Sequence, residues 1–96
     1  MITSQLEQAA PEPKLRSQAE RIIAKFGSPY RLSLLIDQHT MHRRSPSQIY
    51  RWTYPREKGG TGGIVPSFVL FNIVMPVARL EGIFLTPADL HMGPLP

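Results

Sequence analysis

Apolar residues recur along this chain at helical spacing, so the pattern predicts helices rather than strands. The first helix is expected to begin at a capping box, in which Ser17 and Glu20 satisfy each other's backbone N–H groups. An apolar stripe at residues 22–26 follows, and Gly27 is a typical helix-ending residue. A second helix is expected to start immediately, with Pro29 in its first turn.

Residues 37–44 show no periodicity and are expected to form an irregular turn before a short third helix. Ser45 and Gln48 form a second capping box at the start of that helix. Ile49 and Trp52, three residues apart, share one face of it and are expected to point into the core.

The remaining chain is read as a loop followed by an apolar segment. Residues 56–63 hold four glycines and are expected to be flexible. Residues 66–80 are apolar on more than one face, and Pro76 is expected to kink this helix or to start a second piece. A last helical turn is expected at residues 87–90.

These elements define one domain with a tail at each end. Residues 14–90 are expected to form an all-α bundle of four to five helices. Residues 1–13 and 91–96 are expected to be disordered tails, because they are short, polar or rich in proline.

Composition narrows the class of protein. A chain of 96 residues cannot build both a core and a sizeable enclosed active site, so we do not expect an enzyme. There is no cysteine, and His39, His42 and His91 do not have the spacing of metal ligands, so neither a metal nor a cofactor is predicted. No small-molecule site, membrane segment or secretory signal is evident, which favours a cytoplasmic, nucleoid-associated protein.

Positive charge is concentrated in the middle of the chain. Residues 14–58 hold ten of the eleven Lys and Arg residues but only three of the seven acidic residues. Such a distribution is typical of a surface that contacts nucleic-acid phosphates.

The third helix carries residues suited to reading DNA bases. Ser47, Gln48 and Arg51 lie away from its apolar face, and Gln pairs with adenine and Arg with guanine in the major groove. Further side chains are expected to contact the DNA backbone: Arg31, Arg43, Arg44, Ser45, Tyr50, Arg56 and Lys58. The sequence therefore predicts a helix-turn-helix protein that binds double-stranded DNA.

Several segments resemble the lambda Cro/repressor-like superfamily, and most closely its carph-isopro or YdaS-like regulators of bacteria and phages. The segments are IIAKFGSPYRLSLLI, SPSQIYRW, IVP and ARLEGIFLTPADL, which together span about seventy residues. The resemblance implies a lambda repressor-like fold, a repressor or Cro-type role, and base contacts from Ser47, Gln48 and Arg51. The long link at residues 37–44 and the proline at position 76 depart from the general pattern.

The surplus apolar surface predicts a partner. We expect a homodimer on an inverted repeat, with an interface formed by Phe68, Phe71, Val74 and Met75. One alternative is an adaptor that docks on the transcription machinery through residues 68–77. A second alternative is a protein that binds RNA or single-stranded DNA.

Overall fold

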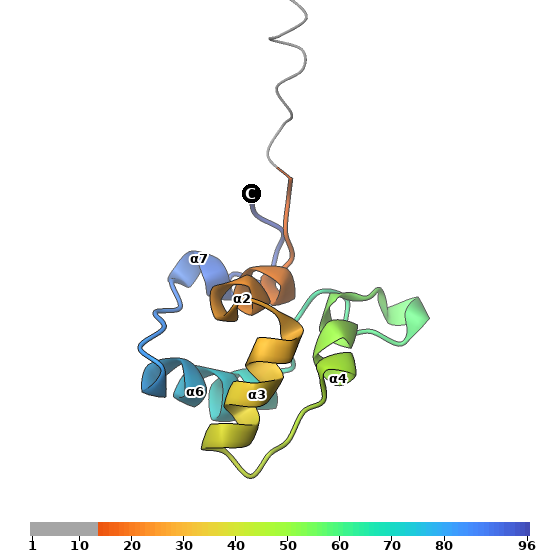
Figure 1. Cartoon of the computed structure of the whole chain (residues 1–96). Helices are drawn as coiled ribbons and strands as arrows, with labels where there is room; N and C mark the ends of the chain where they lie inside the picture. The colour runs from red at the N-terminus through yellow and green to blue at the C-terminus, as the bar shows by residue number, and fades with distance from the viewer. Residues whose placement is uncertain (1–13) are drawn as a thin grey trace, which may run out of the picture.

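The computed structural model describes residues 14–96, and the expected N-terminal tail at residues 1–13 lies outside them. The described chain is a compact all-helical globule (Figure 1). Its elements are α2 (Gln18–Phe26), α3 (Pro29–His39), α4 (Pro46–Tyr50), η1 (Arg51–Thr53), η2 (Arg56–Lys58), α5 (Ser67–Val69), η3 (Leu70–Val74), α6 (Met75–Leu80) and α7 (Pro87–Leu90). No strand forms between residues 14 and 96, and no helix in this range is long and apolar enough to cross a membrane.

Local sequence signals determine where the helices begin. Capping boxes start α2, α4 and α7, and they pair Ser17 with Glu20, Ser45 with Gln48 and Thr86 with Asp89. Each box satisfies backbone N–H groups that a helix leaves without partners at its first turn. The two boxes predicted from the sequence are therefore confirmed.

Helix α3 continues further than the loss of periodicity indicated. Residues 37–39, expected to lie in an irregular turn, belong to its last turn. The helix ends at Thr40, whose backbone N–H and hydroxyl both donate to the carbonyl oxygen of Ile36, each at 2.9 Å. All three residues of the last turn are exposed, so no apolar position marked them as helical.

Pro76 lies in the first turn of α6, so a new α-helical segment begins beside the proline, as predicted. Elements α5, η3 and α6 form one continuous helix, and η3 is a wide π-helical turn just before the proline. A proline has no N–H to donate and its ring crowds the preceding turn, which a wider turn relieves. Met75 accordingly donates to the carbonyl oxygen of Leu70, five residues back.

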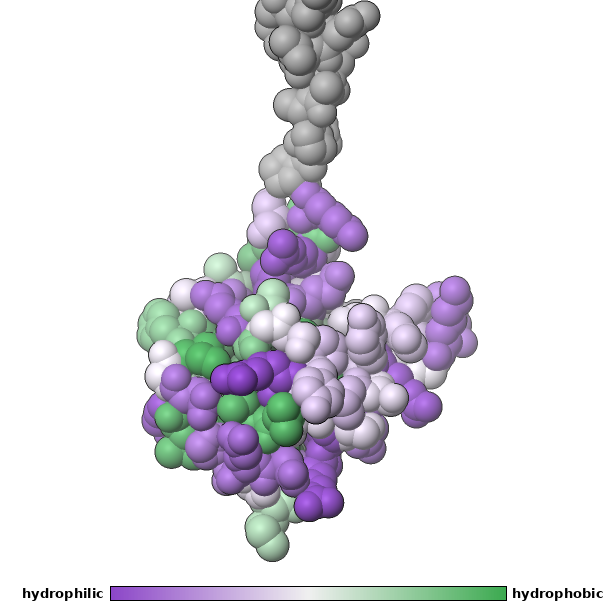
Figure 2. Space-filling model, in the orientation of Figure 1, coloured by the Kyte–Doolittle hydropathy of each residue, from purple (hydrophilic) through white to green (hydrophobic). Residues whose placement is uncertain are grey.

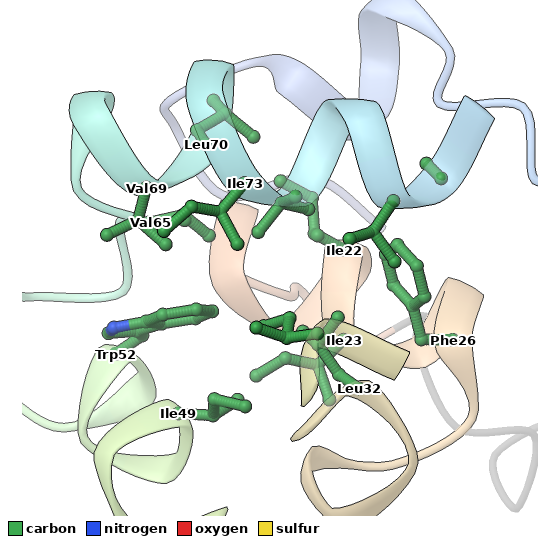
Figure 3. Close-up of a cluster of buried hydrophobic side chains, with 14 of the residues drawn as sticks. Ile22, Ile23, Phe26, Leu32, Ile49, Trp52, Val65, Val69, Leu70 and Ile73 are labelled. Atoms are coloured by element: carbon green, nitrogen blue, oxygen red, sulfur yellow. The ribbon is translucent and has the colours of Figure 1, made fainter. Parts of the chain in front are cut away.

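The core lies where α2, α3 and α4 face the continuous helix of α5, η3 and α6 (Figure 3). This helix, residues 67–80, is called the long helix below. Its fully buried larger side chains are Ile22, Leu32, Ile36, Ile49, Val65, Ile73, Val74 and Val77. Trp52 is only 4% exposed, so the predicted inward face of the third helix is confirmed. Val74 is 0% exposed within its own chain, which corrects its assignment to a subunit interface.

The glycine-rich loop has a defined structure instead of the expected flexibility. The backbone N–H of Ala19 in α2 donates to the carbonyl oxygen of Gly63 at 2.8 Å. The Thr61 hydroxyl lies within hydrogen-bonding distance of the carbonyl oxygens of Trp52 and Ile64. Its glycines therefore permit tight turns and close contacts rather than leaving the backbone without a fixed conformation.

The C-terminal residues are also part of the fold, although we expected an untethered tail at 91–96. Arg16 and Leu95 exchange two backbone hydrogen bonds, of 2.7 and 3.0 Å. The guanidinium group of Arg21, only 7% exposed, donates to four backbone carbonyl oxygens. These acceptors belong to Arg16, Ala88, His91 and Gly93. Residue type and spacing alone did not distinguish this buried arginine from the surface ones.

Candidate nucleic-acid interface

Helix α4 has one buried face and one exposed face. Ile49 and, in the following turn, Trp52 are buried, whereas Ser47, Gln48 and Arg51 are exposed. Figure 2 shows that hydrophilic and weakly polar atoms cover the region of α4 and the loop after it. The three predicted base-reading side chains are thus all exposed, outside the buried face that α4 and the following turn share.

The helix is short because its hydrogen-bonding pattern changes after five residues. Residues 46–50 are α-helical, and a tighter 3-10 turn at residues 51–53 follows directly. The Tyr54 N–H then donates to the carbonyl oxygen of Arg51, and Pro55 follows with no N–H of its own. Arg51 therefore lies at the junction between the two helical forms.

A groove of about 380 Å³ lies between α3 and the start of α4. Aromatic, aliphatic and positively charged side chains line it together with polar ones: Tyr30, Ser33, Leu34, Asp37, Arg43, Arg44, Ser45, Pro46 and Gln48. Gln48 lies on this side of α4. Tyr30 was not predicted as a site residue, although it is an exposed aromatic side chain outside the buried stripe of α3.

A second hollow, of about 340 Å³, lies on the other side of α4. Ser47 and Arg51 line it with Pro46, Tyr50 and Tyr54. The rings of Tyr50 and Tyr54 are tilted against each other, with centroids 6.3 Å apart. Tyr54 was also missed from the sequence, but its four-residue spacing from Tyr50 was the available signal.

The turn between α3 and α4 is held by hydrogen bonds and one ion pair. The Ser33 hydroxyl donates to the carbonyl oxygen of Arg44 at 2.7 Å. The Nε atom of Arg43 lies 2.7 Å from Oδ1 of Asp37, and both side chains are largely exposed. Arg44 donates to the carbonyl oxygen of Arg43 at 2.9 Å. Two of the four predicted phosphate-contacting arginines, Arg43 and Arg44, therefore already have a partner in the chain.

Three further predicted backbone-contacting residues lie on two elements away from α4. Arg31 is exposed on α3. Arg56 and Lys58 are exposed on η2, at the tip of a loop that projects beyond α4 in Figure 1. The structure thus brings the α4 residues together with Arg43 and Arg44, and leaves Arg56 and Lys58 on a separate projection.

Two histidines have structural contacts. His39 Nε2 lies 2.7 Å from Glu81 Oε2 and links α3 to the residue after α6. The ring of His42 packs edge-on against Phe68, with centroids 6.2 Å apart. Across residues 14–96, no three histidine or acidic side chains gather as a metal site requires.

No protein-family model, curated protein or solved structure matches this chain. The resemblance to lambda repressor-like regulators therefore stays a prediction.

Proposed function

We propose that this chain is a sequence-specific regulator that binds double-stranded DNA through a helix-turn-helix formed by α3, residues 40–45 and α4. The observation that carries the proposal is the division of α4 into a buried apolar face and an exposed polar face. This division is what a helix needs when one side packs on its domain and the other enters the major groove.

Arg51 and Ser47 are the base-contacting candidates on the Tyr50–Tyr54 side of the helix. A guanidinium group donates two parallel hydrogen bonds to O6 and N7 of guanine, and a serine hydroxyl contacts several bases. Neither side chain of this pair makes a hydrogen bond to another described residue. Both therefore remain able to bond to a base edge without first losing a protein contact.

Phosphate contacts would supply most of the affinity. Arg31, Arg44, Arg56 and Lys58 are candidates, and Arg43 would exchange its exposed ion pair with Asp37 for a phosphate. Such an exchange is feasible because exposed ion pairs contribute little stability. Binding would then weaken steeply as salt concentration rises, since each neutralised phosphate releases counterions.

The dimer that we propose uses the exposed side of the long helix. Phe68 and Phe71 are 59% and 61% exposed, and Met75 is partly buried against the core. Large exposed aromatic side chains on one helix favour burial in a partner. A two-fold dimer would place two α4 helices about one DNA turn apart, in a Cro-like repressor acting on an inverted repeat in the nucleoid.

The same two phenylalanines favour one other function, an adaptor that docks a protein of the transcription machinery on residues 68–77.

Selection of bound sites from random duplex DNA, followed by salt titration on duplex, single-stranded and RNA probes, separates these functions. A symmetric duplex motif with a steep salt dependence supports the proposal. Preference for RNA or single strands, or no nucleic-acid binding at all, overturns it.

A further inference from the structure

The oxygen and the nitrogen of the Gln48 side-chain amide differ in their hydrogen bonding. Its Oε1 accepts a hydrogen bond of 2.8 Å from the backbone N–H of Ser45. Because that partner is a donor, the atom facing it must be the oxygen, which fixes the orientation of the amide. Its Nε2 has no hydrogen-bond acceptor among residues 14–96, and the side chain is exposed.

Gln18 provides a comparison, because both ends of its side-chain amide bond within the fold. Its Nε2 donates to the carbonyl oxygen of Leu90 at 2.7 Å, and its Oε1 accepts from Val65 N–H at 3.0 Å. Both ends are satisfied, and the side chain is buried. Gln48 differs because only its acceptor end is used by the fold, and its two N–H donors face solvent.

We propose that Gln48 is a specificity-determining residue that reads DNA through its Nε2 donors only, and that it therefore selects guanine over adenine. This inference rests on the proposed DNA-binding function. The adenine contact expected for glutamine needs a donor and an acceptor together, because adenine presents N7 and the N6 amino group. The Gln48 oxygen already accepts from the Ser45 N–H, and this bond directs it toward the start of α4, so adenine N6 would have to donate to the second lone pair of the same oxygen, beside the cap.

Guanine fits the remaining donors better than any other base. In the major groove it alone presents two neighbouring acceptors, N7 and O6, whereas cytosine presents a donor. Turning the amide to read adenine would release the Ser45 N–H, one of the groups that the capping box satisfies at the start of α4. The hydrogen bond that caps α4 therefore also favours the amide orientation that would select guanine.

The test compares the wild-type chain with Gln48→Glu. Glutamate in this position keeps the shape and the capping acceptor but has no N–H, so the fold is retained while the donors are lost. Both proteins are taken through site selection from random duplex DNA, and relative preference between bases is compared rather than affinity, since the added negative charge weakens binding overall. The melting temperatures of both proteins show whether the capping hydrogen bond is retained in the variant.

We expect one position of the wild-type motif to favour guanine over adenine by about tenfold. Gln48→Glu should lose that preference while its melting temperature stays unchanged. Replacing the guanine with 7-deazaguanine, which lacks the N7 acceptor, should weaken the wild-type protein more than the variant.

Three results would overturn the inference. An adenine preference at the Gln48-dependent position, or identical motifs for both proteins, would do so while leaving the proposed function intact. Absence of any duplex binding by the wild-type chain would remove the proposed function, and the inference with it.

Discussion

A Cβ atom placed on Gly60 would lie 2.2 Å from the carbonyl oxygen of Tyr54 and 2.4 Å from the Tyr54 Cβ. The loop after α4 therefore folds back onto the end of its own helix, where only a glycine fits. In addition, the Gly62 N–H donates to the same carbonyl oxygen at 2.9 Å. The projection that carries Arg56 and Lys58 is thus held in place by the helix that carries Arg51.

Gly60→Ala should destabilise the protein more than Gly59→Ala. Gly59 has a φ of 80° but open space around it, so alanine there costs about 1–2 kcal/mol of left-handed strain. At position 60 the backbone itself must move, because Tyr54 contributes main-chain atoms to the contact. Urea unfolding of both variants measures the difference, and equal midpoints would contradict this account of the loop.

Trp52→Ala should lower the free energy of unfolding by roughly 3–5 kcal/mol, because it empties a large volume in the core. Tyr50→Ala is the matched control, since Tyr50 is an exposed aromatic residue two positions away. That control should change stability by no more than about 0.5 kcal/mol. Denaturant unfolding decides the point, and similar losses for the two variants would be inconsistent with the buried position of Trp52.

Stability should fall in acid partly through Asp89. Burial raises the pKa of this carboxyl group, but hydrogen bonds from the Thr86 backbone and hydroxyl, together with Lys25 at 3.3 Å, outweigh it and hold the pKa below its ordinary value of 3.8. A lowered folded-state pKa means that the stabilisation is present above the unfolded-state pKa and is lost as the pH falls through the folded-state value.

Asp89→Asn should therefore reduce the loss of stability between about pH 5 and pH 2 in urea unfolding curves. Glu57→Gln, a neutralised acid on an exposed turn, serves as the control and should leave the pH dependence close to that of the wild type. A wild-type pH profile in Asp89→Asn would show that this carboxylate does not contribute to acid unfolding.

Arg51→Ala should weaken binding to the selected DNA site by about 1–3 kcal/mol and relax the preference at one base pair. Arg79→Ala removes the same charge from α6, outside the proposed interface, and should retain that preference. Titrations on specific and random duplexes provide the comparison. Unchanged affinities of Arg51→Ala for both duplexes would refute the assignment of Arg51 as a base reader.

Phe71→Ser should dissociate the proposed dimer, because it removes a large apolar side chain from the centre of the surface that a partner would cover. Phe84→Ser is the control, since Phe84 is also strongly exposed, at 76% against 61% for Phe71, but lies outside residues 68–77. Sedimentation equilibrium measures the mass of each. A wild-type chain that is monomeric at every concentration and on DNA would exclude the dimer.

Helix starts and the inward face of α4 were predictable because caps and apolar spacing are local signals. The end of α3 was not predictable, because residues 37–39 are polar and exposed and so do not continue the apolar spacing of the helix. The roles of Arg21 and Gly60 also escaped prediction, because each depends on a backbone group brought close only by tertiary folding. For the site, residue types identified Ser47, Gln48 and Arg51 but not the hydrogen bond that occupies one end of Gln48.

The pairing of Arg16 with Leu95 brings the first and last described stretches of backbone side by side, at the end of the globule remote from residues 40–45 (Figure 1). A short peptide linker could therefore connect these stretches, and a circular permutant opened at an exposed turn should still fold. The same arrangement suits single-chain tandem copies, in which two globules joined by a linker would test the proposed dimer.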